Sequence, residues 1–160
     1  MIKVLFAAAL LGIPTVAVAQ VAPSPATYVS KAGAGDQYEI QSSKLVLATT
    51  KNPVLKQFAT MMVSDHNKST ADVKAAAMRS KLTPKPPMLD AMGTRNIAAL
   101  KAARGPSRDV LYISQQKTAH QNALSLHQGY AQAGTAPALK QVAASIAPTV
   151  QHHIEMLSSM

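Results

Sequence analysis

The chain has 160 residues and no cysteine, which excludes both a disulfide scaffold and a thiolate metal site. Its formal net charge is +9, but the basic residues are scattered singly and only six residues are aromatic, which disfavours a nucleic acid platform. We interpret the charge mainly as a solvated face. Weak attraction to an anionic envelope surface is the alternative interpretation.

The first nineteen residues have the pattern of a secretory signal peptide. A basic residue, Lys3, precedes an apolar run over 4–13, and small residues end the segment at 17–19. A membrane anchor is the alternative, but a glycine and a proline interrupt the segment, and the apolar run falls short of the roughly 20 residues that span a bilayer. We therefore predict cleavage after residue 19, export to the periplasm, a flexible leader over 20–26, and one domain over 27–160 that is not transmembrane.

Four segments with 3.6-residue periodicity follow the leader, and proline or glycine stands between them. A proline-rich connection with a short helix around 89–102 separates the second segment from the third, and its length suits a crossover between two helix pairs. Strand-like alternation with turn chemistry is missing from the sequence. The predicted fold is therefore all-α, a four-helix bundle with a short extra helix in the crossover. The four long helices are expected over about 27–50, 53–81, 106–133 and 137–158.

Acidic residues and a histidine interrupt the first two apolar stripes. At 100° per residue, Asp65 and His66 fall on the two flanks of the second stripe and border the core. The first stripe is less regular, because it includes Asp36, and Glu39 lies on its flank. Buried carboxylates and imidazoles are costly unless they are paired or bind a ligand.

The third and fourth predicted helices carry histidines well inside their apolar stripes. His120 and His127 share the inward face of the third helix. In the fourth helix, His153 aligns with apolar residues, whereas its neighbour His152 points away from them. We expect His153 to be buried and His152 to be exposed. Pro148 lies shortly before this pair and is a potential kink.

Four of these residues lie at similar depths in their predicted helices and could converge on one point. A carboxylate with three imidazoles suits a divalent ion such as zinc or copper. The alternative is a hydrogen-bonded polar cluster that only fixes the helix register. The candidate ligands are Glu39, His66, His120 and His153, with Asp65 and His127 as secondary candidates.

Two methionines add a copper-specific observation. Met62 lies one helical turn before His66, and Met156 follows His153 by three residues, so thioether sulfur is expected near two imidazoles. Methionine at helical spacing is more often core filler. The sequence therefore does not distinguish copper from zinc, and no organic cofactor is expected.

Catalytic motifs are scarce in this sequence. It contains no Gly-x-Ser-x-Gly and no His-Glu-x-x-His. The carboxylate-bridged di-iron arrangement requires Glu-x-x-His on two helices, and that spacing does not occur either. An enzyme is thus the less favoured interpretation.

Four stretches, AGDQYEIQSSKLV, VLKQFATMMVSDHNKS, RDVLYISQQKTAHQNALSL and IAPTVQHHIEML, resemble the DUF4142 family. The resemblance extends from about Tyr28 to Leu157 and implies an exported bacterial protein with a ferritin-like four-helix bundle and no established activity. Two positions depart from the family pattern: Ala119 replaces a common Asp before the histidine, and His127 replaces an apolar or aromatic residue. The resemblance implies recurrent polar positions at Glu39, Asp65, His66, Asp109, Tyr112, His120 and His153.

Three functions remain open from the sequence. The first is a metal-binding bundle of the bacterial envelope that acts in storage, buffering or sensing. The second is a non-catalytic structural or stress-related protein whose basic surface contacts an anionic polymer or another envelope protein. The third is a hydrolase or redox enzyme that uses the same cluster with an open coordination position.

Overall fold

The computed structural model describes residues 22–160, so the predicted signal segment lies outside the described residues. Every regular element within 22–160 is an α-helix, which confirms the all-α prediction. The short helix in the crossover is also confirmed. The five helices are α1 (Pro25–Leu47), α2 (Pro53–Arg79), α3 (Ala91–Ala102), α4 (Gly105–Ala133) and α5 (Pro137–Ser158).

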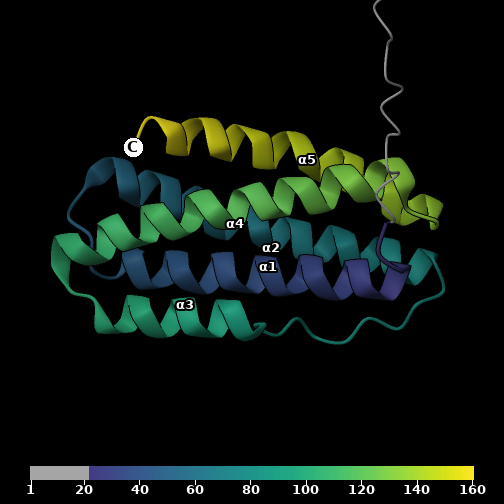
Figure 1. Cartoon of the computed structure of the whole chain (residues 1–160), viewed down its shortest axis with the longest axis horizontal. Helices are drawn as coiled ribbons and strands as arrows, with labels where there is room; N and C mark the ends of the chain where they lie inside the picture. The colour runs from purple at the N-terminus through teal and green to yellow at the C-terminus, as the bar shows by residue number, and fades with distance from the viewer. Residues whose placement is uncertain (1–21) are drawn as a thin grey trace, which may run out of the picture.

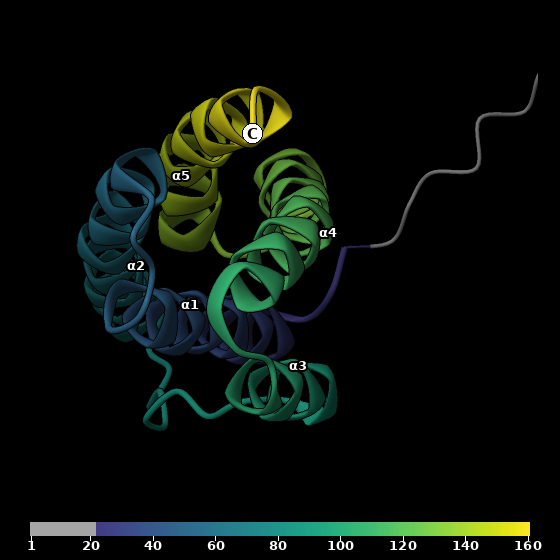
Figure 2. The same cartoon turned by 90° about the vertical axis from the view of Figure 1, so that its left-hand side faces the viewer.

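The four long helices form a bundle of two antiparallel hairpins, α1–α2 and α4–α5 (Figure 1). The connection after α2 returns along the bundle with α3, so α4 runs parallel to α2 and antiparallel to α1. Seen end-on, the ring order is α1, α2, α5, α4, and α3 lies outside the ring against α1 and α4 (Figure 2). One long crossover between helix pairs is the connectivity of ferritin-like bundles.

Side-chain caps and prolines set the helix boundaries. Ser24 accepts a hydrogen bond from the Thr27 amide, so α1 begins at Pro25, two residues earlier than predicted, and it ends at Leu47 rather than near residue 50. α5 has the predicted bounds and continues through Pro148. None of the helices within 22–160 carries an apolar stretch that would span a bilayer.

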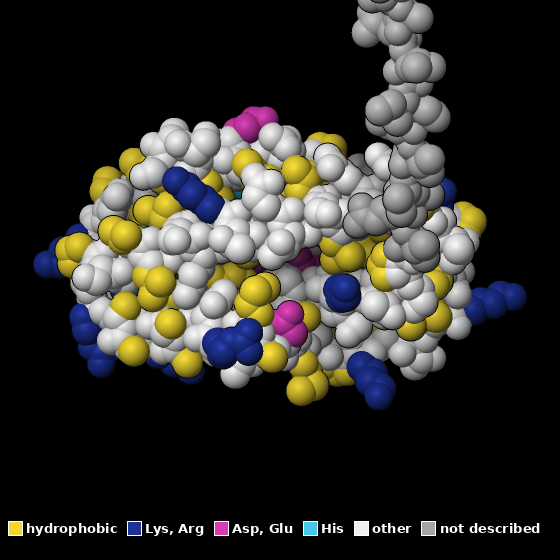
Figure 3. Space-filling model, viewed as in Figure 1, with side chains coloured by type: hydrophobic (Ala, Val, Ile, Leu, Met, Phe, Trp, Pro, Cys, Tyr) yellow, Lys and Arg dark blue, Asp and Glu magenta, His cyan; other side chains and the backbone are white. Residues whose placement is uncertain are grey.

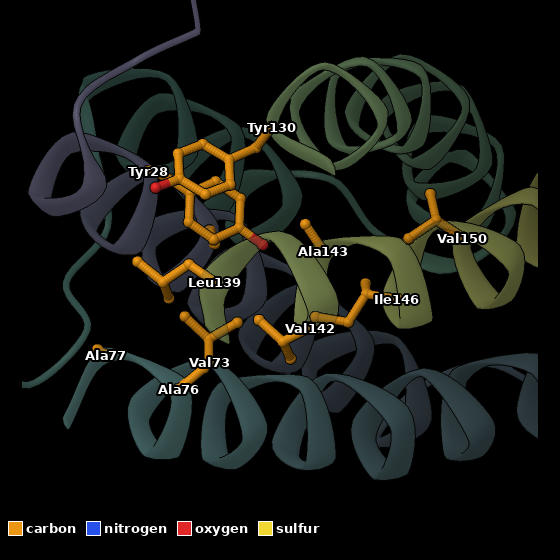
Figure 4. Close-up of a cluster of buried hydrophobic side chains, with 11 residues drawn as sticks. Tyr28, Val73, Ala76, Ala77, Tyr130, Leu139, Val142, Ala143, Ile146 and Val150 are labelled. Atoms are coloured by element: carbon orange, nitrogen blue, oxygen red, sulfur yellow. The ribbon is translucent and has the colours of Figure 1, made fainter. Parts of the chain in front are cut away.

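Two apolar clusters fill the two ends of the bundle. Figure 4 shows the first, where Tyr28 and Tyr130 stack beside Leu139 and Val142. The second cluster forms at the opposite end around Phe58 and other fully buried large apolar side chains, among them Leu55, Met62 and Leu100. Burying a side chain of this size contributes roughly 1.5–3 kcal/mol. Together the clusters hold the intervening middle layer of the bundle, which is polar, in a fixed geometry.

Candidate metal centre

Three histidines from three different helices meet in the polar middle layer. His66 comes from α2, His120 from α4 and His153 from α5, and all three are buried. One ring nitrogen of each lies within 4.8 Å of the corresponding nitrogens of the other two. The predicted convergence of these three imidazoles is therefore present in the structure.

His66 is oriented by a carboxylate of α1. Its Nδ1 lies 2.7 Å from Asp36 Oδ1, and the other oxygen of Asp36 accepts a hydrogen bond from Thr70 at 3.0 Å. This contact leaves Nε2 of His66 as the buried ring nitrogen without a partner. Burial lowers the pKa of His66, but the hydrogen bond and charge of Asp36 outweigh it, so the pKa is raised above 6.5. Below this raised pKa both ring nitrogens of His66 carry a proton, so a cation at Nε2 would have to displace the proton there.

His120 is oriented by its own helix. Its Nδ1 lies 2.9 Å from the carbonyl oxygen of Gln116, which can only accept, so Nδ1 carries the proton and donates. The opposite nitrogen, Nε2, then presents a lone pair and lies 3.3 Å from His153 Nδ1. Burial, assisted by the positive charge of His66, lowers the pKa of His120 to about 3. His120 is therefore neutral at physiological pH and able to ligate.

His153 is oriented by a carboxylate of α2. Its Nε2 lies 3.0 Å from Asp65 Oδ2 and donates to it, which leaves Nδ1 with the lone pair. Burial lowers the pKa of His153, although the hydrogen bond to Asp65 opposes the shift. His152 exposes 64% of its side chain, so the predicted opposite burial of the two neighbouring histidines is confirmed.

The three contacts give each imidazole one oxygen acceptor and one inward nitrogen. Metal-binding histidines commonly show this arrangement, because the outer hydrogen bond fixes the tautomer and the ring orientation. Two ligands placed 2.0–2.1 Å from a tetrahedral ion are about 3.3 Å apart. The inward nitrogens of His120 and His153 already have this separation. Because both are acceptors, the pair needs a proton, a water molecule or a cation between or beside them.

Glu39 lies beside this group and not among its three inward nitrogens. Its Oε1 is 3.6 Å from His120 Nδ1, on the outer edge of that ring. The other oxygen, Oε2, is buried without a partner. Burial raises the pKa of Glu39 to about 7, even though the positive charge of His66 opposes the shift. In this position Glu39 can stabilise charge on His120.

The remaining candidates lie at three places. Asp65 is the acceptor for His153, as described above. His127 lies apart from the three histidines, where its Nδ1 is 3.0 Å from the Tyr28 hydroxyl, and burial lowers its pKa to about 4. Met62 packs in the second apolar cluster, and Met156 lies against the same cluster.

Two of the positions implied by the family resemblance connect helices away from the histidines. The Tyr112 hydroxyl lies 2.8 Å from Ser43 Oγ, which joins α4 to α1. Asp109 accepts a hydrogen bond of 2.7 Å from Thr50, which fastens the α1–α2 connection to the start of α4. These two residues therefore have a structural part in the bundle.

Asp36 belongs to the site although it is not among the candidate ligands predicted from the sequence. It lies in the α1 stripe one turn before Glu39, so two inward acids three residues apart were the available signal. The structure pairs Asp36, not Glu39, with His66.

Comparisons with known proteins agree with this fold. The sequence matches the profile of DUF4142, described as a domain of unknown function, over residues 13–160. No curated protein shows significant similarity to the chain. Among solved structures, a DUF305 protein from Streptomyces coelicolor, described as secreted, is 14% identical with a TM-score of 0.69, covering 85% of this chain and 89% of its own.

Two further solved structures share the architecture. A DUF305 fragment from Deinococcus radiodurans is 12% identical with a TM-score of 0.74, covering 87% of this chain and 95% of its own. CopM in its Cu(II)-bound form is 17% identical with a TM-score of 0.73, and the match covers 87% of this chain and 96% of that chain. Similarity at this level of identity supports the bundle fold alone.

Proposed function

Because the chain belongs to the DUF4142 family, whose description gives no activity, we propose a function from the site itself: binding of one divalent metal ion, copper(II) or zinc, by the three buried imidazoles. His66 would contribute Nε2, His120 Nε2 and His153 Nδ1. The single observation that carries the proposal is the common orientation of these rings, each with one N–H directed to an oxygen and one nitrogen directed inward.

The donor set is compatible with both metals. Neutral imidazole is a good ligand for zinc and for copper(II), and three protein ligands leave one position for water or another small molecule. The Cu(II)-bound CopM structure supports testing copper first, since it shares the fold, although not enough sequence to transfer ligands. Glu39 stays a candidate fourth ligand that would have to turn from the outer edge of His120.

We further propose that this binding takes place outside the cytoplasm, in storage, buffering or sensing of the metal. The N-terminal pattern predicts export, and one protein of the same fold is described as secreted. A buried site with three imidazole ligands suits retention of an ion more than rapid turnover of a substrate.

The test is a titration of metal-free protein over residues 20–160 with copper(II) or zinc chloride, followed by thermal unfolding. A ligand that binds only the folded state adds about 2.7 kcal/mol at a hundredfold excess over Kd, so the melting temperature should rise. His120→Ala should abolish the rise, and the matched control His152→Ala should retain it. The rise should weaken as pH falls through the raised pKa of His66, because protons compete with the metal for its Nε2.

A structural role for the same cluster is the second candidate function. Asp36 and Asp65 already pair with His66 and His153, so two of the three imidazoles have carboxylate partners without an ion. Such pairs could fix the register of α1, α2 and α5 in an envelope interaction protein. Melting that is independent of both metals in the wild-type protein would defeat metal binding and favour this function.

A further inference from the structure

A cavity of about 580 Å³ lies between α1 and α4. Small side chains create it, since α1 contributes Ala32, Ala34 and Gly35 to the wall, and α4 contributes Ala119 and Ala123. Figure 3 shows the molecule from this side, with a hollow between α4 and α1 and acidic side chains inside and beside it. The cavity thus results from the small side chains of α1 and α4.

The cavity ends at the histidine group. His66 lines it, whereas His120 and His153 do not, so the cavity reaches the group at His66. Three buried polar atoms without partners belong to lining residues: the Tyr130 hydroxyl and, at the histidine group, Nε2 of His66 and Oε2 of Glu39. A polar species bound at the inner end would give the atoms of His66 and Glu39 the partners that they lack.

The acidic lining contrasts with the charge of the whole chain. Three of the seven acidic residues, Asp36, Glu39 and Asp90, line the cavity, and Lys31 is the one lysine or arginine among its lining residues. A low-dielectric cavity in which one sign of charge predominates raises the local concentration of the opposite ion. The arrangement therefore attracts cations into a protein that otherwise repels them.

We propose that this acid-lined cavity is the route by which a divalent cation reaches the three imidazoles, with Asp90 as the outer carboxylate that captures it. The inference rests on the proposed metal-binding function. Asp90 is exposed at the start of α3, where it also caps the helix through the Gly93 amide. The folded bundle offers the ion this passage, and Asp36 and Glu39 follow along it.

The first test narrows the cavity without touching a ligand. Gly35 and Gly129 both line it, and a Cβ added at either position meets no other atom within 4 Å. Copper(II) chloride is mixed with metal-free protein in a stopped-flow instrument, and quenching of tyrosine fluorescence reports loading. Gly35→Phe and Gly129→Phe should slow loading and release by the same factor, at least about tenfold. The matched control is Val110→Phe, at an exposed position of α4 outside the cavity.

The second test removes the outer charge. Asp90→Asn keeps an N-cap of equal quality, because asparagine caps helices as well as aspartate does. Loading should slow about threefold at low ionic strength and return towards the wild-type rate in high salt, since salt screens exposed charges. Asp72→Asn, at an acid that does not line the cavity, is the control and should load at the wild-type rate.

The outcomes separate this inference from the proposed function. Equal slowing of loading and release in the phenylalanine variants supports the route, because a purely structural effect would change the ratio of the two rates. Wild-type loading rates in those variants and in Asp90→Asn, with copper still bound, would overturn the route and leave metal binding intact. Absence of copper binding in the wild-type protein would overturn the proposed function itself.

Discussion

Replacement of Asp36 by asparagine tests the orientation of His66 most directly. The aspartate is buried and accepts two hydrogen bonds, one from His66 and one from Thr70. Asparagine has the same shape, but only one of its two terminal atoms can accept. If its amide nitrogen faces the ring, His66 Nδ1 becomes the acceptor and the proton moves to Nε2, where the metal would bind.

The expected loss follows from these contacts. A hydrogen bond to a charged group contributes 1.5–3 kcal/mol, and one of the two survives, so Asp36→Asn should cost about 2 kcal/mol. For a bundle of this size the melting temperature should fall by about 6–8 °C. Metal affinity should fall by about 10- to 100-fold, the usual effect of removing the acceptor that orients a ligating histidine.

The stability loss should also depend on pH. The folded pKa of His66 lies above its unfolded value of 6.5. The contribution of the His66–Asp36 pair is therefore complete below pH 6.5 and is lost as pH rises through the folded pKa. Urea unfolding of Asp36→Asn should show a larger deficit at pH 6 than at pH 9.

Asp72→Asn is the control, because it removes an exposed carboxylate of α2 that is paired only with Lys68. Equal stability and equal metal affinity of Asp36→Asn and the wild-type protein would refute the assigned tautomer. So would a deficit that grows with pH.

Further predictions concern single side chains. The folded pKa of Glu39, about 7, exceeds its ordinary 4.5, so ionisation of Glu39 destabilises the fold as pH rises through this range. Glu39→Gln should therefore be up to about 3 kcal/mol more stable than wild type at pH 8, with no gain below pH 4.5. A pH-independent difference in urea unfolding would contradict this. His153→Ala should lower the free energy of unfolding by about 2–4 kcal/mol, whereas His152→Ala should stay within about 0.5 kcal/mol of wild type. Equal melting temperatures of the two variants would contradict their opposite burial. Gly35→Ala should stabilise α1 by about 0.5–1 kcal/mol, because the added Cβ meets open space. Gly134→Ala should destabilise the protein, because its Cβ would lie 2.5 Å from the backbone oxygen of Tyr130. Calorimetry that gives both variants the same sign of change would be inconsistent with this packing.

The sequence was sufficient to predict the helices and the inward histidines. Periodicity placed His120 and His153 on inward faces because each is surrounded by apolar residues at helical spacing. It placed His66 only on a flank, yet His66 is buried, since the interface of α2 with α1 and α5 covers a wider arc than the apolar stripe alone indicates.

The pairing of the acids could not be predicted in the same way. Asp36 and Glu39 both lie on the inner side of α1, and a small rotation of that helix decides which of them meets His66. Asp65 was predicted to border the core as a secondary candidate ligand. Instead it accepts from His153 of α5, a contact between helices whose relative height no single-helix pattern contains.

The two hairpins share the histidine group between them. Asp36, Asp65 and His66 belong to the α1–α2 hairpin, whereas His120 and His153 belong to the α4–α5 hairpin. An ion held by all three imidazoles would therefore join halves of the chain that are separated by the whole crossover. In a protein without cysteine it would act as a removable crosslink, stronger when metal is plentiful and absent when metal is scarce. Docking of one half on the other would then report the concentration of the ion.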